Sequence, residues 1–243
     1  MTWTRFVALG DSLTEGVGDP IGHGGLRGWA SHLAAGLAAL NPHLTFSNLA
    51  RRSLTTADVL AGQLPVAVEM NPDLASALVG MNDLMQPDFD AGRFERELDE
   101  LVSDLQGIGA TVLMASFPDV SRYLLAPRRV REPIHRRLAA ATEVTRSVAA
   151  ARGAVFVDVW SLPDAQGRDI LSIDRMHPNA RGHLLLARAF AVLLGEEANH
   201  AIELPVPREA RGFSLENARH LGWIARNART EAFRFLRRYL SFR

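Results

Sequence analysis

The feature that most constrains the fold is the alternation of short apolar segments with longer helical ones. Five apolar segments have the length and composition of buried strands: Arg5–Leu9, Leu44–Ser47, Leu74–Val79, Thr111–Ala115 and Ala154–Val159. Helical patterns separate and follow them: Gly28–Leu40, Thr55–Leu60, Phe89–Leu105, Glu132–Ala151 and Asn179–Leu194. Strands joined by helices favour right-handed crossovers and a parallel sheet covered on both faces. We therefore expect a ligand site at the carboxyl ends of these strands.

Composition excludes several classes of chemistry. The 243-residue chain has no Cys and no Lys, which excludes disulfides, thiolate metal sites, Lys Schiff bases and P-loops. Its 27 basic and 27 acidic residues balance, so the chain shows no overall bias toward nucleic acid. The N-terminus lacks the features of a removable leader, and the longest apolar stretch is too short to span a bilayer. We expect one domain over residues 1–200 and a cytoplasmic location.

Polar residues suited to acyl-transfer chemistry follow two of these strands and precede the last helix. Ser12 directly follows the first strand and needs a general base to act as a nucleophile. His177 can supply that base, and Asp174, three residues earlier, can orient its imidazole. Asn82, after the third strand, can donate a hydrogen bond to an oxyanion. Each residue taken singly also fits a turn, helix cap or loop, so it is their joint occurrence that indicates a hydrolase.

The set resembles the SGNH hydrolase family, also called the GDSL esterases. The first block of the family reads Gly10–Leu13 (GDSL) here, the third reads Gly80–Asp83 (GMND), and the fifth reads Asp174–His177 (DRMH). The resemblance covers roughly residues 5–195. The run Gly25–Trp29 (GLRGW) is shared with actinobacterial members of the family.

This resemblance implies a three-layer α/β/α sandwich around a five-stranded, parallel, flavodoxin-like sheet. It implies a serine hydrolase of carboxylic esters in which Ser12 is the nucleophile, His177 the base and Asp174 the orienting partner of the base. The backbone N–H of Ser12 and the side-chain amide of Asn82 would form part of the oxyanion hole. No metal or organic cofactor is implied, and the partner is a small acyl-ester substrate rather than a nucleic acid.

One position departs from the family pattern. The second block of the family usually supplies a Gly whose N–H is the third oxyanion donor, and Ser53 stands at that position here. A backbone donor does not require Gly, provided that the local φ suits a residue with a Cβ. We therefore expect the N–H of Ser53 to complete the oxyanion hole.

Residues near the first block are candidates for the substrate pocket. Asp11 and Leu13 flank the nucleophile, and Arg27 and Trp29 follow shortly after it. Arg27 and Trp29 fit equally well as packing residues of the first long helix, so both interpretations stay open. The glycines within residues 16–25 do not match a dinucleotide-binding motif, and they predict a flexible rim.

Residues 208–243 form a basic segment beyond the region of resemblance. Apolar residues recur at helical spacing between Leu221 and Tyr239, with Arg residues on the opposite side, which predicts a basic amphipathic helix. Such a helix packs against the domain or a partner chain, or binds an anionic membrane surface. The segment keeps open a rival function, a weakly active membrane- or partner-binding module. Within the enzyme class, thioesterase, lysophospholipase and sugar O-deacetylase activities also stay open.

Overall fold

The sheet of this protein has the predicted number of strands and the predicted direction. The computed structural model describes residues 3–21, 24–162, 167–195, 202 and 222–223. The strands are β1 (Arg5–Gly10), β2 (Thr45–Asn48), β3 (Leu74–Leu78), β4 (Thr111–Ala115) and β5 (Val155–Val157). All neighbouring strands pair in parallel, in the order β2-β1-β3-β4-β5. This is the flavodoxin-like order, so the predicted fold class is confirmed.

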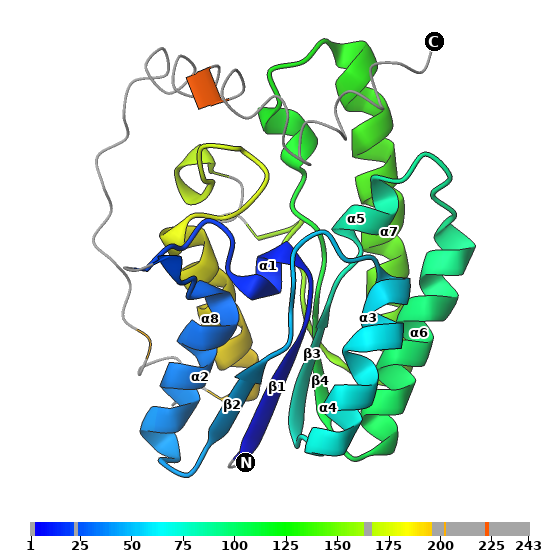
Figure 1. Ribbon diagram of the computed structural model, residues 1–243. Coiled ribbons are helices and arrows are strands. Elements are labelled where there is room, and N and C mark those ends of the chain that lie inside the picture. The colour runs from blue at the N-terminus through cyan, green and yellow to red at the C-terminus, as the bar shows by residue number, and fades with distance from the viewer. Residues whose placement is uncertain (1–2, 22–23, 163–166, 196–201, 203–221, 224–243) are drawn as a thin grey trace.

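Helices cover both faces of the sheet and make a three-layer sandwich (Figure 1). One outer layer consists of α2 (Gly28–Leu40) and α8 (Ala180–Leu194). The other consists of α3 (Thr56–Gly62), α4 (Leu64–Met70), α6 (Ala91–Gly107) and α7 (Arg128–Arg152). Short elements lie near the carboxyl ends of the strands: the helices α1 (Ser12–Glu15) and α5 (Met81–Leu84), and the 3-10 turns η2 (Val120–Tyr123) and η4 (Arg168–Ile170).

Residue alternation along the strands explains why both faces need a helical layer. Side chains of successive strand residues point to opposite faces of a sheet. Phe6 and Ala8 of β1 accordingly pack in the core beneath α2 and α8, whereas Val7 and Leu9 pack in the core beneath the other layer. All four are essentially inaccessible to solvent, so β1 is buried on both faces, as expected for the central part of a parallel sheet.

Two helices differ from the sequence-based expectation. We expected a helix to begin at Glu132, yet α7 begins at Arg128 and contains Pro133 in its second turn. Pro133 is the sixth residue of this 25-residue helix, so its missing N–H removes one intrahelical hydrogen bond, that to the carbonyl of Arg129, while the remaining turns keep the helix intact. The sequence pattern did not predict α4 as a separate helix, although Pro65 lies in its first turn, where proline is favoured.

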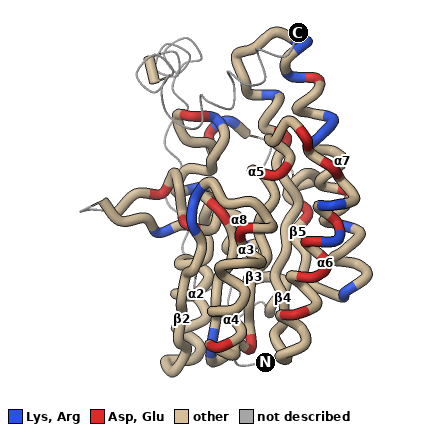
Figure 2. Tube along the Cα trace, turned by 45° about the vertical axis from the view of Figure 1, so that its right-hand side comes forward, with Lys and Arg blue, Asp and Glu red and all other residues tan. Residues whose placement is uncertain are grey.

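The outer surfaces of α6 and α7 carry charges of both signs. Figure 2 shows acidic and basic residues interspersed along these two helices. Arg152 of α7 binds both carboxylate oxygens of Asp99 on α6, at 2.6 and 2.5 Å. Ion pairs that remain partly open to solvent, like this one, stabilise proteins little, so the apolar residues facing the sheet hold this layer in place.

The predicted amphipathic helix at the C-terminus lies outside the described residues, except for residues 222 and 223. Its docking and the domain boundary before residue 208 therefore stay predictions. Within the described ranges, no helix is long and apolar enough to cross a membrane.

Candidate active site

A tight turn at the end of β1 positions Ser12. Gly10 has a φ of 150°, and a Cβ at this residue would lie 2.3 Å from the carbonyl oxygen of Leu78, so the turn requires glycine. Asp11 caps α1, because its carboxylate accepts a hydrogen bond of 3.1 Å from the N–H of Leu13. Ser12 is thus the first residue of a short helix at the carboxyl end of the sheet.

The turn from Ser172 to His177 holds the carboxylate of Asp174 by several hydrogen bonds. Asp174 Oδ1 accepts from the hydroxyl of Ser172 at 2.6 Å, and from the N–H groups of Met176 and His177 at 2.9 and 3.0 Å. Burial alone would raise the pKa of Asp174, but the hydrogen bond and charge of His177, with these other donors, lower it to about 2. Asp174 is therefore an ionised acceptor beside the imidazole.

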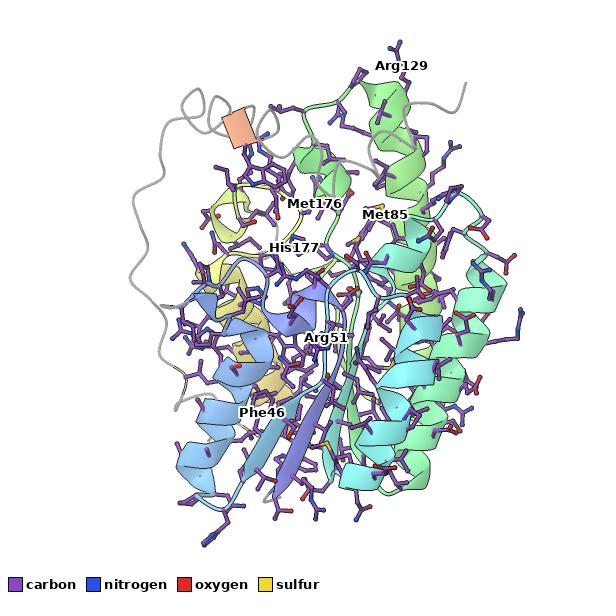
Figure 3. The ribbon with its side chains drawn as sticks, viewed as in Figure 1. Phe46, Arg51, Met85, Arg129, Met176 and His177 are labelled. Atoms are coloured by element: carbon purple, nitrogen blue, oxygen red, sulfur yellow. The ribbon has the colours of Figure 1, made fainter. Side chains whose placement is uncertain are left out.

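The imidazole of His177 bridges Asp174 and Ser12. Its Nδ1 lies 2.7 Å from Asp174 Oδ2, and its Nε2 lies 2.9 Å from Ser12 Oγ. Because the ionised carboxylate only accepts, Nδ1 carries the proton and Nε2 accepts from the serine hydroxyl. Figure 3 shows His177 and the adjacent Met176 above the carboxyl ends of the strands. The structure thus brings together three side chains that are 165 and three positions apart in the chain.

Asn82 lies in α5, the short helix that follows β3 at the carboxyl ends of the strands. Gly80 precedes α5 with a φ of 125°, and a Cβ there would lie 2.6 Å from the Phe94 ring. The Asn82 amide nitrogen donates to the carbonyl oxygen of Leu54 at 2.9 Å and to Asp11 Oδ2 at 3.3 Å. Both hydrogens of the amide therefore have acceptors within the protein.

Ser53 occupies the loop that Asn82 holds through the neighbouring residue, Leu54. It is exposed and has a φ of 68°, in the left-handed region that favours glycine. The next turn is fixed by Asp83, whose two carboxylate oxygens accept from the Thr56 N–H at 3.1 and 3.0 Å. The backbone at Ser53 thus retains a glycine-like conformation although the residue carries a Cβ.

The carboxyl group of Asp11 lies among these residues and is only 2% exposed. Burial raises its pKa from 3.8 to about 7, against the lowering effect of the Leu13 N–H and of the nearby His177. The second buried carboxyl, Asp83, has a pKa raised to about 6 by burial, opposed by its hydrogen bonds from Thr56. Two acids beside the site therefore change their charge near neutral pH.

The four predicted pocket residues separate into two groups. Asp11 and Leu13 line a cavity that also contains Ser12 and His177. Trp29 is completely buried and packs against Phe190, with ring centroids 5.0 Å apart. Arg27 forms an ion pair of 3.3 Å with Asp19 instead of lining that cavity. Of the two interpretations left open by the sequence, pocket or packing, the structure supports packing for Trp29, whereas Arg27 fits neither and pairs with Asp19.

The glycine-rich run is closely packed at two of its residues, so the prediction of a flexible rim is wrong there. A Cβ on Gly18 would lie 1.9 Å from the carbonyl oxygen of Pro178, and one on Gly16 would lie 2.9 Å from the N atom of Gly28. The buried His183 joins the same region, since its Nδ1 accepts from the Trp29 N–H and its Nε2 lies 3.0 Å from the Val17 oxygen. The contact between Gly18 and Pro178 packs this run against the turn that contains His177.

The cavity that opens at Ser12 and His177 has a volume of about 400 Å³. Its other walls come from the carboxyl ends of β3 and β4, the segment after β5, and α8. Sequence reasoning missed these wall residues and also Ser172. The apolar stretch of α8 was the only hint of this wall in the sequence. It shows that the helix is apolar, but it does not show that one side of the helix faces the nucleophile.

Among the described residues, no group of three or more His, Asp or Glu side chains is placed to hold a metal ion. The side chains at this edge supply a hydroxyl, an imidazole, carboxyl groups and hydrogen-bond donors. An Asp–His–Ser chain of this geometry is the arrangement that activates a serine for attack on a carbonyl.

The fold is an α/β hydrolase-like fold built on a flavodoxin-like sheet. A family model described as "GDSL-like Lipase/Acylhydrolase family" matches residues 8–185. The match spans most of the chain, so the protein belongs to this family and is a carboxylic ester hydrolase.

Known proteins resemble this chain in sequence and in fold. An acetylxylan esterase of Geobacillus stearothermophilus is 24% identical over 209 residues, which cover 79% of this chain and 94% of that protein. An α/β hydrolase from the metagenome of Lake Arreo superposes with a TM-score of 0.64 at 23% identity, over 82% of this chain and 96% of that one. A lipase/acylhydrolase of Enterococcus faecalis gives 0.61 at 19% identity, over 85% and 99%. At these identities the structural matches establish the fold.

Proposed function

We propose that this protein hydrolyses carboxylic esters through an acyl-enzyme formed on Ser12. The observation that carries the proposal is the continuous chain from Asp174 through His177 to Ser12, with heavy-atom separations of 2.7 and 2.9 Å. The 2.9 Å between His177 Nε2 and Ser12 Oγ is within the range over which a base takes a proton from its nucleophile, and the 2.7 Å to Asp174 is within hydrogen-bond range. The lowered pKa of Asp174 supports its role, because an ionised carboxylate stabilises the imidazolium that forms.

The reaction begins when Ser12 Oγ attacks the ester carbonyl and transfers its proton to His177 Nε2. The tetrahedral intermediate collapses as His177 returns this proton to the leaving alcohol, and the acyl group stays on Ser12. A water molecule then enters, gives a proton to the same Nε2 and attacks the acyl-enzyme. Collapse of the second intermediate releases the carboxylic acid and restores the serine hydroxyl.

We propose the Ser12 N–H, the Ser53 N–H and the Asn82 amide as the donors to the oxyanion. The left-handed φ of Ser53 supports its inclusion, because the backbone there keeps the conformation of a glycine donor. Asn82 already donates to Leu54 and Asp11, and its bond to Asp11 is the longer of the two at 3.3 Å. We infer that the oxyanion replaces the Asp11 carboxylate as the acceptor of that hydrogen.

Removal of acetyl groups from a carbohydrate is the second candidate function. It is favoured by the relative from Geobacillus stearothermophilus, which is named an acetylxylan esterase. Release of acetate from acetylated xylooligosaccharides, measured beside release from a simple acetate ester, tests this candidate. A carbohydrate deacetylase would hydrolyse the oligosaccharide with a kcat/KM at least as high as that of the simple ester.

The proposed mechanism is tested by hydrolysis of p-nitrophenyl esters by the wild type and the Ser12→Ala variant. We expect kcat to fall by about 10⁴-fold or more, because the variant has no nucleophile. A matched control is Ser103→Ala. Ser103 lies in α6, and its hydroxyl accepts a hydrogen bond from Arg152 of α7 rather than contacting the candidate site. Equal activity of the Ser12→Ala variant and the wild type would overturn the mechanism.

A further inference from the structure

The cavity beside Ser12 differs in its chemistry from what an acetyl group needs. Most of its wall is aliphatic or aromatic, and the wall includes Leu78 and Ala115 from the sheet and Leu185 and Ala189 from α8. Its volume of about 400 Å³ falls within the range of pockets that bind whole small ligands, about 300–1,000 Å³. An acetyl group offers a single methyl to such a wall.

Polar groups on this wall are engaged with the protein or lie next to the nucleophile. The hydroxyl of Ser116 donates to Asp158 at 2.9 Å and accepts from the Trp160 N–H at 3.0 Å. The carboxyl of Asp11 lies next to Ser12, where the reacting carbonyl must sit. Arg188 contributes to the wall from α8. A ligand extending from Ser12 into the cavity therefore meets mainly carbon atoms.

The order of the reaction steps favours the acyl half of the ester as the occupant of the cavity. The acyl group stays bonded to Ser12 while the alcohol leaves and water replaces it beside His177 Nε2. An acyl chain held between the sheet and α8 would therefore keep its contacts with the cavity wall through both steps of the reaction. Buried residues line its inner part, such as Ile170 at 6% exposure, whereas Val192 is 50% exposed and marks an outer end open to solvent.

We propose that the cavity binds the acyl chain of the substrate and that the protein prefers esters of medium-length aliphatic acids over acetate esters. This inference rests on the proposed function, since it assigns the acyl half of the same site. Each methylene transferred from water to an apolar wall favours binding by about fourfold. We expect kcat/KM to rise from acetate through butyrate to octanoate, and then to level off because the outer end is open rather than closed.

A substitution inside the cavity provides the direct test. Ala189→Phe places a ring on the wall formed by α8 and should lower the ratio of kcat/KM for the octanoate ester to kcat/KM for the acetate ester by about tenfold or more. Ala150→Phe makes the same change at an exposed position of α7 and should alter neither value. Unchanged selectivity in the Ala189→Phe variant would overturn the proposal, as would a wild-type profile that is highest at acetate.

A labelling experiment keeps the proposal testable if the Ala189→Phe variant fails to fold. Wild-type protein is treated with an ethyl and a decyl fluorophosphonate, and the second-order rate of covalent labelling is measured for each. We expect the decyl reagent to react about tenfold faster or more. Equal rates would overturn the assignment of the cavity and leave Ser12 as a nucleophile, whereas no labelling by either reagent would overturn the proposed function itself.

Discussion

The two halves of the candidate active site differ in how far they are assembled. In the acid–base half, Asp174, His177 and Ser12 already form one continuous chain of hydrogen bonds. In the oxyanion half, the Asn82 amide donates to Leu54 and to Asp11 rather than to an open position. The hydrogen bonds of the first half are therefore already formed, and we propose that the second half becomes available to an oxyanion when a substrate oxygen replaces Asp11 as the acceptor.

This difference follows from how each half is held. The acid–base half depends on a turn whose own N–H groups bind Asp174, so local backbone geometry fixes it. The oxyanion half depends on contacts between three separate segments, the turns after β1, β2 and β3. We expect substitutions in the first half to affect every substrate equally. Substitutions in the second half should act mainly on the transition state.

The largest effect after loss of the nucleophile should come from Asp174→Asn. An asparagine in this place does not hold Nδ1 of His177 as the protonated nitrogen, so kcat should fall by about 10³- to 10⁴-fold. Steady-state hydrolysis of p-nitrophenyl butyrate measures this. The exposed Asp104 of α6 offers a matched Asp→Asn control that should leave kcat unchanged. A decrease smaller than about tenfold would show that Asp174 is not the orienting group.

A smaller effect is expected from Asn82→Ala in the oxyanion half. Loss of one oxyanion donor should lower kcat by about 10²- to 10³-fold with little change in KM, because the donor acts on the transition state. Asn82→Asp keeps the shape of the side chain and removes the donor, so it should show a similar loss. If either variant raised KM and left kcat intact, Asn82 would be binding the ground state instead.

Asp11→Asn should change how stability depends on pH. The pKa of Asp11 is about 7 in the folded protein and 3.8 as its ordinary value, so between these values the folded state holds a proton that the unfolded state has lost. Unfolding then releases a proton, and the free energy of unfolding falls as pH rises through this window. The Asp11→Asn variant has no carboxyl group at this position, so this contribution to the pH dependence of its free energy of unfolding is absent.

Thermal unfolding of wild type and Asp11→Asn at about pH 5 and about pH 8 measures the difference. We expect the variant to gain stability relative to the wild type at the higher pH. A difference in Tm that is the same at both pH values would contradict the raised pKa. Asp104→Asn, which alters an exposed carboxylate, is the matched control.

The smallest effect is expected from Ser53→Gly. Ser53 already has a left-handed φ of 68°, so glycine removes the strain of the Cβ without moving the N–H. The free energy of unfolding should change by about 1 kcal/mol or less, and kcat should stay within about threefold. A rise in kcat of about tenfold or more would show that the serine distorts the oxyanion hole.

Much of the fold could be predicted from the sequence because its signals are local. Each strand is a short apolar run, and the helix beginning at Thr56 carries a capping box in which Thr55 and Asp58 bind each other's backbone N–H. The resemblance to a family with known sheet order then supplied the order of the strands. Helix boundaries such as the start of α7 were missed because Pro133 is read locally as a helix start.

The candidate site could be predicted only as far as its motifs extend. Ser12 and Asn82 stand in short motifs at strand ends, and Asp174 and His177 stand in a motif before the last helix, so the sequence predicted that they lie near one another. The burial of Asp11, the engagement of Asn82 with Leu54, and the cavity wall on α8 depend on how distant segments pack. The role of Trp29 could not be predicted for the same reason: a tryptophan at this position in the sequence fits the core and the pocket equally well.

The central claim is that the hydrogen bonds from Asp174 to His177 and from His177 to Ser12 make Ser12 the nucleophile. The most direct test is to react the protein with a fluorophosphonate and locate the added mass by peptide mapping. We predict a single modification on Ser12, absent in Ser12→Ala and slowed by about 10³-fold or more in His177→Ala. Modification of a different serine, or equal labelling of the wild type and the Ser12→Ala variant, would contradict the account.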